Sequence, residues 1–298
     1  SCPTSRASSS TCTRCSTVSS TTAPSGLGTP PRTLAIWAPL VLLWVLWGST
    51  YLGIASWNTN GFSDGHSEVI AWLLTSRKLD IIALQDTRLP PTDHSYHRSA
   101  WTNTWAPGGA SIFSYSTSPR PNVGGQAILL ASRLANRRLN SWSDPYGLGI
   151  LLETTLQTDT GIIRIISLYQ PCATGSANGL QSQLADWLHK TGSDLTYNEY
   201  IQQQIGRRAS LPHQHLVILG DFNARWTPAL ASSYSAYNVE NVHPPSAKSS
   251  RFSGDNATGK IDHILSSIPP SKQAWNRTTR LGGYTQTIDR SGPTYPST

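Results

Sequence analysis

The residues best suited to chemistry in this sequence stand at the end of an apolar run. Asp221 and Asn223 follow residues 216–219, which read as a buried strand. Side chains two residues apart on an extended chain point the same way, and Gly220 allows the backbone to turn sharply there. A carboxylate and an amide in this arrangement suit a metal ion, a water molecule or a phosphate oxygen, although Asp-x-Asn is also common in ordinary turns.

Polar side chains mark four other predicted strands. They are Asn58 and Asn60 after one strand, Asp86 after the next, Tyr169 at the end of a third, and Asp262 with His263 inside the last. Each of these residues also has a purely structural explanation. Asn58 and Asn60 could form a turn, and Asp86 could form a surface ion pair with Arg88. Tyr169 could be a core aromatic residue with its hydroxyl hydrogen-bonded, and Asp262 a buried acid with its hydrogen bonds made. Open α/β sheets bind ligands beyond the ends of their strands, so several polar strand ends favour one shared site.

The elements that must position these groups are short apolar runs that alternate with helical patterns. Strands are predicted at residues 51–57, 79–84, 125–131, 150–156, 162–169, 216–219 and 261–265, and helices at residues 67–77, 180–190 and 197–208. Strands and helices mixed in this way predict an α/β domain from about residue 50 to the C-terminus.

A segment of different composition precedes this domain. Residues 1–32 are rich in Ser, Thr, Pro and Gly and are predicted to be disordered, whereas residues 36–47 are strongly apolar. A membrane span needs roughly 20 apolar residues. The window 34–54 nearly qualifies, so a transmembrane segment is an alternative to an apolar leader that packs on the domain or folds poorly. We therefore predict a leader at residues 1–49 and a domain at residues 50–298, with no membrane partner.

The composition of the chain indicates which classes of partner it could bind. Its 298 residues allow one large domain or two smaller ones, and its net charge of +7 suits a polyanion such as nucleic acid. The basic residues are scattered, however, and the doublets at 137–138 and 207–208 fit a solvated surface. Cys12 and Cys15 form one C-x-x-C pair without a second, so no zinc site is predicted. Methionine is absent, even at position 1, which is typical of an internal piece of a longer reading frame.

Taken in order, the polar strand ends resemble a known family. The motifs Ser-Trp-Asn-x-Asn-Gly, Leu-Gln-Asp-Thr-Arg, Tyr-x-Pro, Gly-Asp-Phe-Asn-Ala and Ile-Asp-His-Ile-Leu are similar to those of the endonuclease/exonuclease/phosphatase superfamily. They look closest to the apurinic-type endonuclease domain of non-LTR (LINE-like) retrotransposons, from about Tyr51 to Leu265. The resemblance implies a four-layer α/β sandwich with two central mixed sheets flanked by helices. It also implies hydrolysis of DNA phosphodiesters with Mg²⁺, or with Mn²⁺.

The resemblance assigns roles residue by residue. Asn58 and Asp86 would hold the metal. Asn60, Tyr169 and Asn223 would bind substrate, and Tyr169 would donate a hydrogen bond to the scissile phosphate. Asp221, helped by Asn223, would orient or deprotonate the attacking water, and Asp262 would support a catalytic His. A reverse transcriptase domain in the same polyprotein and a nuclear location would follow for an active retroelement.

Two departures from the family pattern weaken the expected activity. Asp86 stands where the family usually has a Glu, so its carboxylate is one methylene shorter. The family ends in Ser-Asp-His, but residues 285–291 contain no His, and Asp289 is left as a remnant of a degenerate or truncated motif. His263 is an unsuitable substitute because it points to the opposite face of its strand from Asp262.

The sequence therefore predicts an impaired magnesium-dependent DNA endonuclease. Two alternatives stay open: a relic that binds nucleic acid without catalysis, and a phosphoesterase of the same superfamily that acts on a small or lipid phosphoester. Whether the chain is an active enzyme is undecided at this stage.

Overall fold

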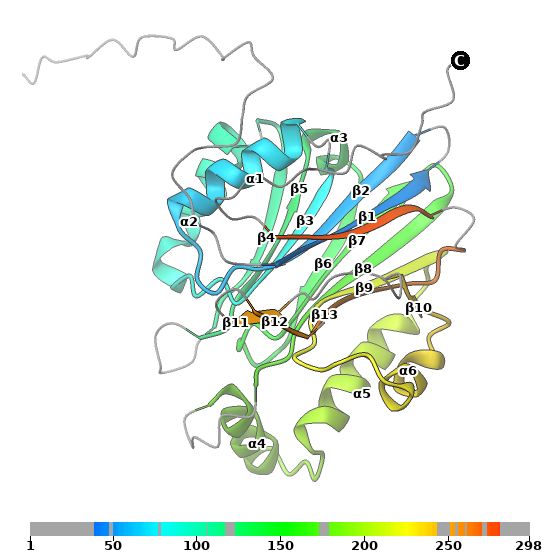
Figure 1. Cartoon of the computed structure of the whole chain (residues 1–298). Coiled ribbons are helices and arrows are strands. Elements are labelled where there is room, and N and C mark those ends of the chain that lie inside the picture. The colour runs from blue at the N-terminus through cyan, green and yellow to red at the C-terminus, as the bar shows by residue number, and fades with distance from the viewer. Residues whose placement is uncertain are drawn as a thin grey trace, which may run out of the picture.

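The computed structural model describes residues 39–47, 50–76, 79–105, 107–116, 123–172, 179–242, 251–253, 256–259, 261–269 and 273–280. Two β-sheets pack face to face, and helices cover their outer faces (Figure 1). The Ser/Thr-rich segment 1–32 and the degenerate motif at 285–291 lie outside the described residues.

The first sheet carries six strands in the order β14-β1-β2-β3-β5-β4. Its strands are β1 (Pro39–Trp47), β2 (Thr50–Asn58), β3 (Ile81–Gln85), β4 (Ala110–Ser114), β5 (Gln126–Leu130) and β14 (Gln273–Arg280). Only the β2–β3 pair is parallel, so the sheet is mixed.

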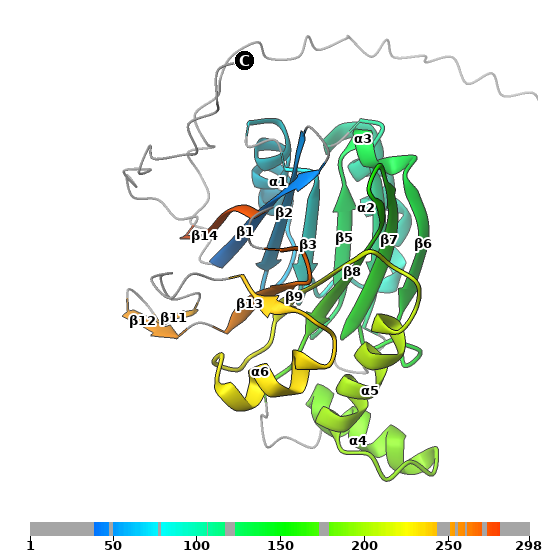
Figure 2. The same ribbon diagram turned by 90° about the vertical axis from the view of Figure 1, so that its right-hand side faces the viewer.

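The second sheet also has six strands, in the order β10-β13-β9-β8-β7-β6. Its strands are β6 (Arg138–Ser143), β7 (Leu151–Thr158), β8 (Gly161–Tyr169), β9 (His215–Asp221), β10 (Glu240–Asn241) and β13 (Asp262–Ser266). Here β8 and β9 form the parallel pair. A small hairpin of β11 (Arg251–Ser253) and β12 (Asn256–Gly259) lies beside β13 (Figures 1 and 2).

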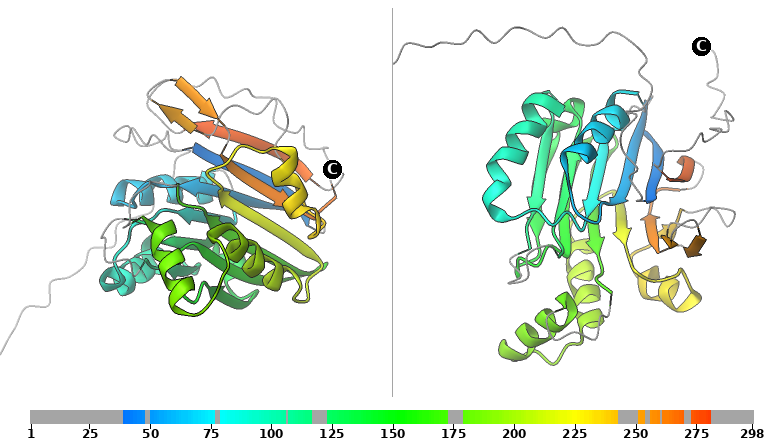
Figure 3. Two further views of the ribbon diagram at one scale, coloured as in Figure 1. Left: turned by 90° about the horizontal axis from the view of Figure 1, so that it is seen from below. Right: turned by 60° about the vertical axis from the view of Figure 1, so that its left-hand side comes forward.

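The described helices divide between the two outer faces. They are α1 (Asp64–Ser76), the 3₁₀ turn η1 (Pro91–Asp93), α2 (His94–Ala100), the π-helical η2 (Trp101–Trp105), α3 (Ser132–Ala135), α4 (Leu180–Lys190), α5 (Tyr197–Ala209) and α6 (Pro228–Ser235). Figure 2 shows α4, α5 and α6 gathered away from α1, α2 and α3, and the view from below in Figure 3 brings α4, α5 and α6 to the front.

Three separate apolar clusters follow from the alternation of side chains along the strands. One lies between the sheets and includes Ile54 and Val217. A second joins the outer face of the first sheet to α1 through Trp57 and Ile70. The third joins the outer face of the second sheet to α4, α5 and α6 through Ile218. Three interfaces make four layers, so the predicted α/β sandwich is confirmed.

The apolar segment before residue 50 forms β1. It pairs antiparallel with β2, from Leu40 opposite Trp57 to Trp47 opposite Thr50, and its other edge pairs with β14. Residues 39–47 of the predicted leader therefore form a strand within the first sheet. Within the part of the chain that the structure describes, no helix has the length and apolar character to cross a membrane.

Candidate active site

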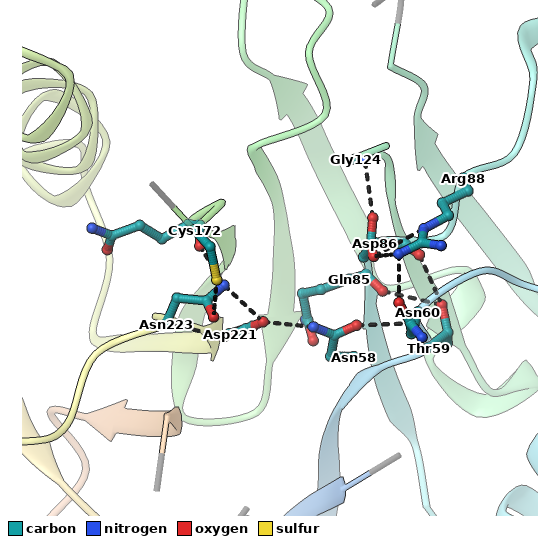
Figure 4. A network of polar contacts seen from close by, with 11 residues as sticks. Asn58, Thr59, Asn60, Gln85, Asp86, Arg88, Gly124, Cys172, Asp221 and Asn223 are labelled. Carbon is teal, nitrogen blue, oxygen red and sulfur yellow. Dashed lines mark hydrogen bonds and ion pairs between the residues drawn. The ribbon is translucent and has the colours of Figure 1, made fainter. Parts of the chain in front are cut away.

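The polar strand ends come together at one edge of the two sheets. Because β2 and β3 are parallel, and β8 and β9 are parallel, each pair of strands ends at the same edge of its sheet. A hydrogen bond joins the two edges: Asn58 Nδ2 donates to Asp221 Oδ2 over 2.5 Å, between side chains 163 residues apart (Figure 4). This bond brings the polar ends of β2 and β9 together.

Asp221 is a buried carboxylate that accepts hydrogen bonds from two asparagine residues. Its Oδ2 accepts from Asn58 and, over 3.1 Å, from Asn223 Nδ2, while its Oδ1 accepts from the backbone N–H of Asn223 over 2.8 Å. Amide donors stabilise the negative charge without cancelling it. These bonds fix the positions of both carboxylate oxygens of Asp221.

Asn223 is fixed by the loop that follows β8. Its Nδ2 also donates to the carbonyl of Gln170 over 2.6 Å, and its Oδ1 accepts from the thiol of Cys172 over 2.9 Å. Sequence reasoning did not assign either residue to the site. Their place directly after Tyr169 was the signal that could have found them.

Asp86 is a buried carboxylate with a cation beside it. Its Oδ2 accepts from Arg88 Nη2 over 2.7 Å and from Nε over 3.1 Å, and its Oδ1 accepts from the Gly124 N–H over 2.9 Å. Arg88 Nη2 also donates to Asn60 Oδ1 over 2.5 Å. The predicted ion pair is therefore present, but its carboxylate is buried in the site and does not lie on an open surface.

Unusual backbone conformations gather here. Among the described residues, five that are not glycine have positive φ angles, and four of them belong to this network: Asn60, Asp86, Arg88 and Asn223, with φ between 46° and 52°. Such conformations persist only where the surroundings hold them, and they cluster at functional sites.

Tyr169 is near enough to both carboxylates to feel their charges, and it remains a hydrogen-bond donor. The side chain is partly buried at the end of β8, opposite Asp221 in the β8–β9 register. Burial raises the pKa of its phenol, and the negative charges of Asp86 and Asp221 raise that pKa further. The hydroxyl is therefore protonated at neutral pH.

Asp262 and His263 point to opposite sides of β13, as predicted. Asp262 is buried and stands opposite Asp221 in the β9–β13 register. His263 lies against the rings of Phe222 and Trp226, with centroids 5.3 and 5.4 Å away, and its Nε2 is 2.8 Å from the carbonyl of Ala224. This imidazole is part of the packing on the outer face of the sheet and does not replace a terminal His.

The oxygen atoms of Asp86 and Asn58 would suit Mg²⁺ or Mn²⁺, which prefer oxygen ligands. Mg²⁺ is often bound by one or two carboxylates, with water and substrate phosphate completing its shell. In the described residues, no group of three or more His, Cys, Asp or Glu side chains gathers to hold a metal ion. Asn58 Oδ1 accepts from the Asn60 N–H over 3.0 Å, and Arg88 contacts Asp86 Oδ2. The donor chemistry fits a sparse site, and Asn58 Oδ1 and both carboxylate oxygens of Asp86 already accept hydrogen bonds from protein donors.

Solved structures of similar fold include several nucleic-acid enzymes. An AP endonuclease, LMAP, from Leishmania major is 12% identical, with a TM-score of 0.52 over 72% of this chain and 78% of that one. The 3′ phosphatase NExo from Neisseria, bound to a product DNA hairpin, is 21% identical, with a TM-score of 0.48 over 73% and 86%. The catalytic domain of Xenopus laevis APE2 is 16% identical, with a TM-score of 0.48 over 72% and 81%.

No curated protein matches the sequence. A family model, however, matches residues 55–282, which include every strand end of the site. That match covers well over half of the chain. The chain therefore belongs to the endonuclease/exonuclease/phosphatase family.

Proposed function

We propose that this chain is a divalent-metal-dependent phosphodiesterase that acts on DNA, with weakened catalysis. The observation that carries the proposal is the hydrogen bond between Asn58 and Asp221, because it unites the metal-binding and water-handling halves in one site. The motif resemblance further favours an endonuclease from a non-LTR retrotransposon polyprotein, with a reverse transcriptase domain elsewhere in that polyprotein and a nuclear location.

The residues of the site supply the steps of in-line hydrolysis. Asp221 accepts a proton from the attacking water, and Asn223 holds the carboxylate in position for that transfer. The protonated Tyr169 donates a hydrogen bond to a non-bridging phosphate oxygen, where negative charge grows in the transition state. Mg²⁺ held by Asp86 and Asn58 would stabilise charge on the phosphate when bound.

Two features support weakened catalysis. Residues 285–291 contain no His to protonate or stabilise the leaving oxygen. The shorter carboxylate of Asp86 is engaged by Arg88. DNA as the substrate is supported by the net charge of +7 and by the motif resemblance to DNA endonucleases.

Plasmid nicking in Mg²⁺ tests this proposal. We expect slow nicking that EDTA stops and that Asp221→Asn lowers by about 100-fold, the contribution of a positioned general base. Asp159→Asn is the matched control, because Asp159 is exposed and contacts Arg137 away from the site. Equal nicking by wild type and Asp221→Asn would refute the site assignment. Fast nicking by the wild type would refute the weakening.

A non-catalytic DNA-binding protein is the second candidate, and the pairing of Asp86 with Arg88 favours it. This candidate predicts DNA affinity that falls steeply with salt and no hydrolysis. Turnover of a small or lipid phosphoester without DNA cleavage would instead identify a different phosphoesterase substrate.

A further inference from the structure

We infer that Arg88 is a built-in cation that competes with the divalent metal for Asp86 and leaves when a substrate phosphate arrives. This inference rests on the proposed function, in which Asp86 is a metal ligand. It adds a regulatory role for a residue that belongs to neither the metal-binding nor the water-handling set.

The first support is the geometry of the pair. Two nitrogens of Arg88, Nη2 at 2.7 Å and Nε at 3.1 Å, converge on Oδ2 of Asp86. The other carboxylate oxygen accepts from the Gly124 N–H over 2.9 Å. Both oxygens that could face a metal therefore already have protein donors.

The second support is the backbone conformation of the turn that brings Arg88 against Asp86. Asp86 and Arg88 both have positive φ angles, 50° and 52°, which side chains with a Cβ rarely adopt. Backbone hydrogen bonds from Thr87 and Arg88 to the carbonyls of Gly125 and Gly124, 3.1 and 2.9 Å long, hold the turn in place. A long surface side chain that met Asp86 by chance would need no such turn.

The third support is the partial exposure of the Arg88 side chain. The Asp86 side chain is 5% exposed, whereas that of Arg88 is 33% exposed. Arg88 Nη2 also donates to the exposed Asn60. One side of the guanidinium therefore faces the buried carboxylate while the rest of the side chain reaches solvent.

Charge decides what this arrangement does. A dication that approached Oδ2 would meet a positive group already hydrogen-bonded to that oxygen, so the metal binds only if Arg88 moves away. A phosphodiester offers the guanidinium a second anionic partner with matching fork geometry. Arg88 therefore moves from Asp86 to the substrate phosphate, and metal binding becomes coupled to substrate binding.

The test is Mn²⁺ binding alone to the full chain, measured by isothermal titration calorimetry. Arg88→Gln removes the competing charge, so we expect its Mn²⁺ dissociation constant to fall by about tenfold relative to wild type. Arg137→Gln is the matched control, because it removes one positive charge and one exposed ion pair elsewhere and should leave Mn²⁺ binding unchanged. An Arg88→Gln protein that is folded by circular dichroism but binds Mn²⁺ no more tightly would overturn the inference.

Asp86→Asn separates this inference from the proposed function. If Asp86→Asn binds Mn²⁺ as wild type does, Asp86 is not a metal ligand, and the metal assignment of the proposed function fails together with the competition. If Asp86→Asn loses Mn²⁺ binding and Arg88→Gln gains none, only the competition fails. Should Arg88→Gln not fold, Arg88→Asn also removes the charge and suits the positive φ of this position, and a dissociation constant no lower than that of wild type would again overturn the inference.

Discussion

At the scale of single residues, neighbours decide what two buried carboxylates can do. Asp221 accepts from the side-chain amides of Asn58 and Asn223 and from the Asn223 backbone N–H. Asp86 is held by a guanidinium, so its charge is compensated. The same side-chain type is thus held by amide donors in one place and by a cation in the other.

His66 gives a prediction for pH dependence. Its Nδ1 accepts from the Ser63 N–H over 3.1 Å at the end of the loop that carries Asn60, and burial lowers its pKa from the ordinary value of 6.5. The unfolded chain therefore binds the proton more readily, so the stability due to neutral His66 is complete above about pH 6.5 and is lost as the pH falls below it.

His66→Asn should flatten this dependence, because an amide oxygen can accept from Ser63 but does not titrate. Urea denaturation of both proteins at pH 7.5 and pH 5.5 would measure the effect. Wild type should lose more free energy of unfolding between the two pH values than the variant does. Equal losses would mean that other groups cause the acid sensitivity.

At the scale of elements, the site depends on how closely β8 and β9 approach each other. Gly220 has a φ of +145°, and a Cβ added to it would lie 1.9 Å from the carbonyl oxygen of Leu168 on β8. The sequence suggested a turn at this glycine; the structure adds a close approach between neighbouring strands. That approach places Asp221 beside Tyr169.

Gly220→Ala should therefore destabilise the fold by about 3 kcal/mol, since the backbone of β8 must move. Gly192→Ala is the comparison, because Gly192 also has a positive φ, +72°, but its Cβ would meet nothing within 4 Å. We expect that change to cost only about 1 kcal/mol. Chemical denaturation measures both, and similar losses for the two variants would argue against the close approach.

A buried ion triad attaches α5 to the second sheet. Glu153 on β7 is fully buried, accepts from Arg208 over 2.6 and 2.8 Å, and also pairs with Arg164 on β8. Glu153→Gln would leave two guanidinium groups without a carboxylate and should cost about 3–5 kcal/mol of unfolding free energy. Asp159→Asn, in an exposed pair, should cost less than about 1 kcal/mol. A loss below 1 kcal/mol for Glu153→Gln in urea denaturation would contradict this account.

The sequence predicted the elements with clear apolar patterns. The helix at 180–190 matches α4, and the strands that end at Asn58, Gln85, Tyr169 and Asp221 were all recognised. The edge strand β6 was missed because most of its residues are exposed and it lacks an apolar alternation. The strand β1 was missed because its continuous apolar pattern does not distinguish a leader from a buried strand.

At the scale of the whole molecule, each sheet supplies one half of the site. Asn58 and Asp86 follow strands of the first sheet, and Tyr169 and Asp221 end strands of the second. Buried polar groups bridge the sheets: Gln85 Nε2 donates to Ser167 Oγ over 3.0 Å, and Ser167 Oγ donates to Gln126 Oε1 over 2.5 Å. Gln85 directly precedes Asp86, so this bridge connects the end of β3 next to Asp86 to the second sheet.

The position of β1 predicts where the domain begins. A chain of residues 39–298 should unfold at the same temperature as the full chain, whereas residues 50–298 should unfold at least about 5 °C lower. The shorter chain exposes the edge of β2 and leaves β14 without its neighbour. Thermal unfolding and size-exclusion chromatography would compare them, and equal midpoints would support a boundary at residue 50.

The sequence by itself determined the chemical groups and their local placement. Asp221 and Asn223 are two residues apart, so the turn after one strand brings them together wherever that strand lies. Tertiary structure alone decided that Asn58 reaches Asp221, that Arg88 joins Asp86 to Asn60, and that Cys172 contacts Asn223. Apart from Arg88 with Asp86, these contacts link residues far apart in the chain. The contact of Asn58 with Asp221 depends on how the two sheets pack, and the other two depend on which strands pair within a sheet. The periodicity within any one strand encodes neither.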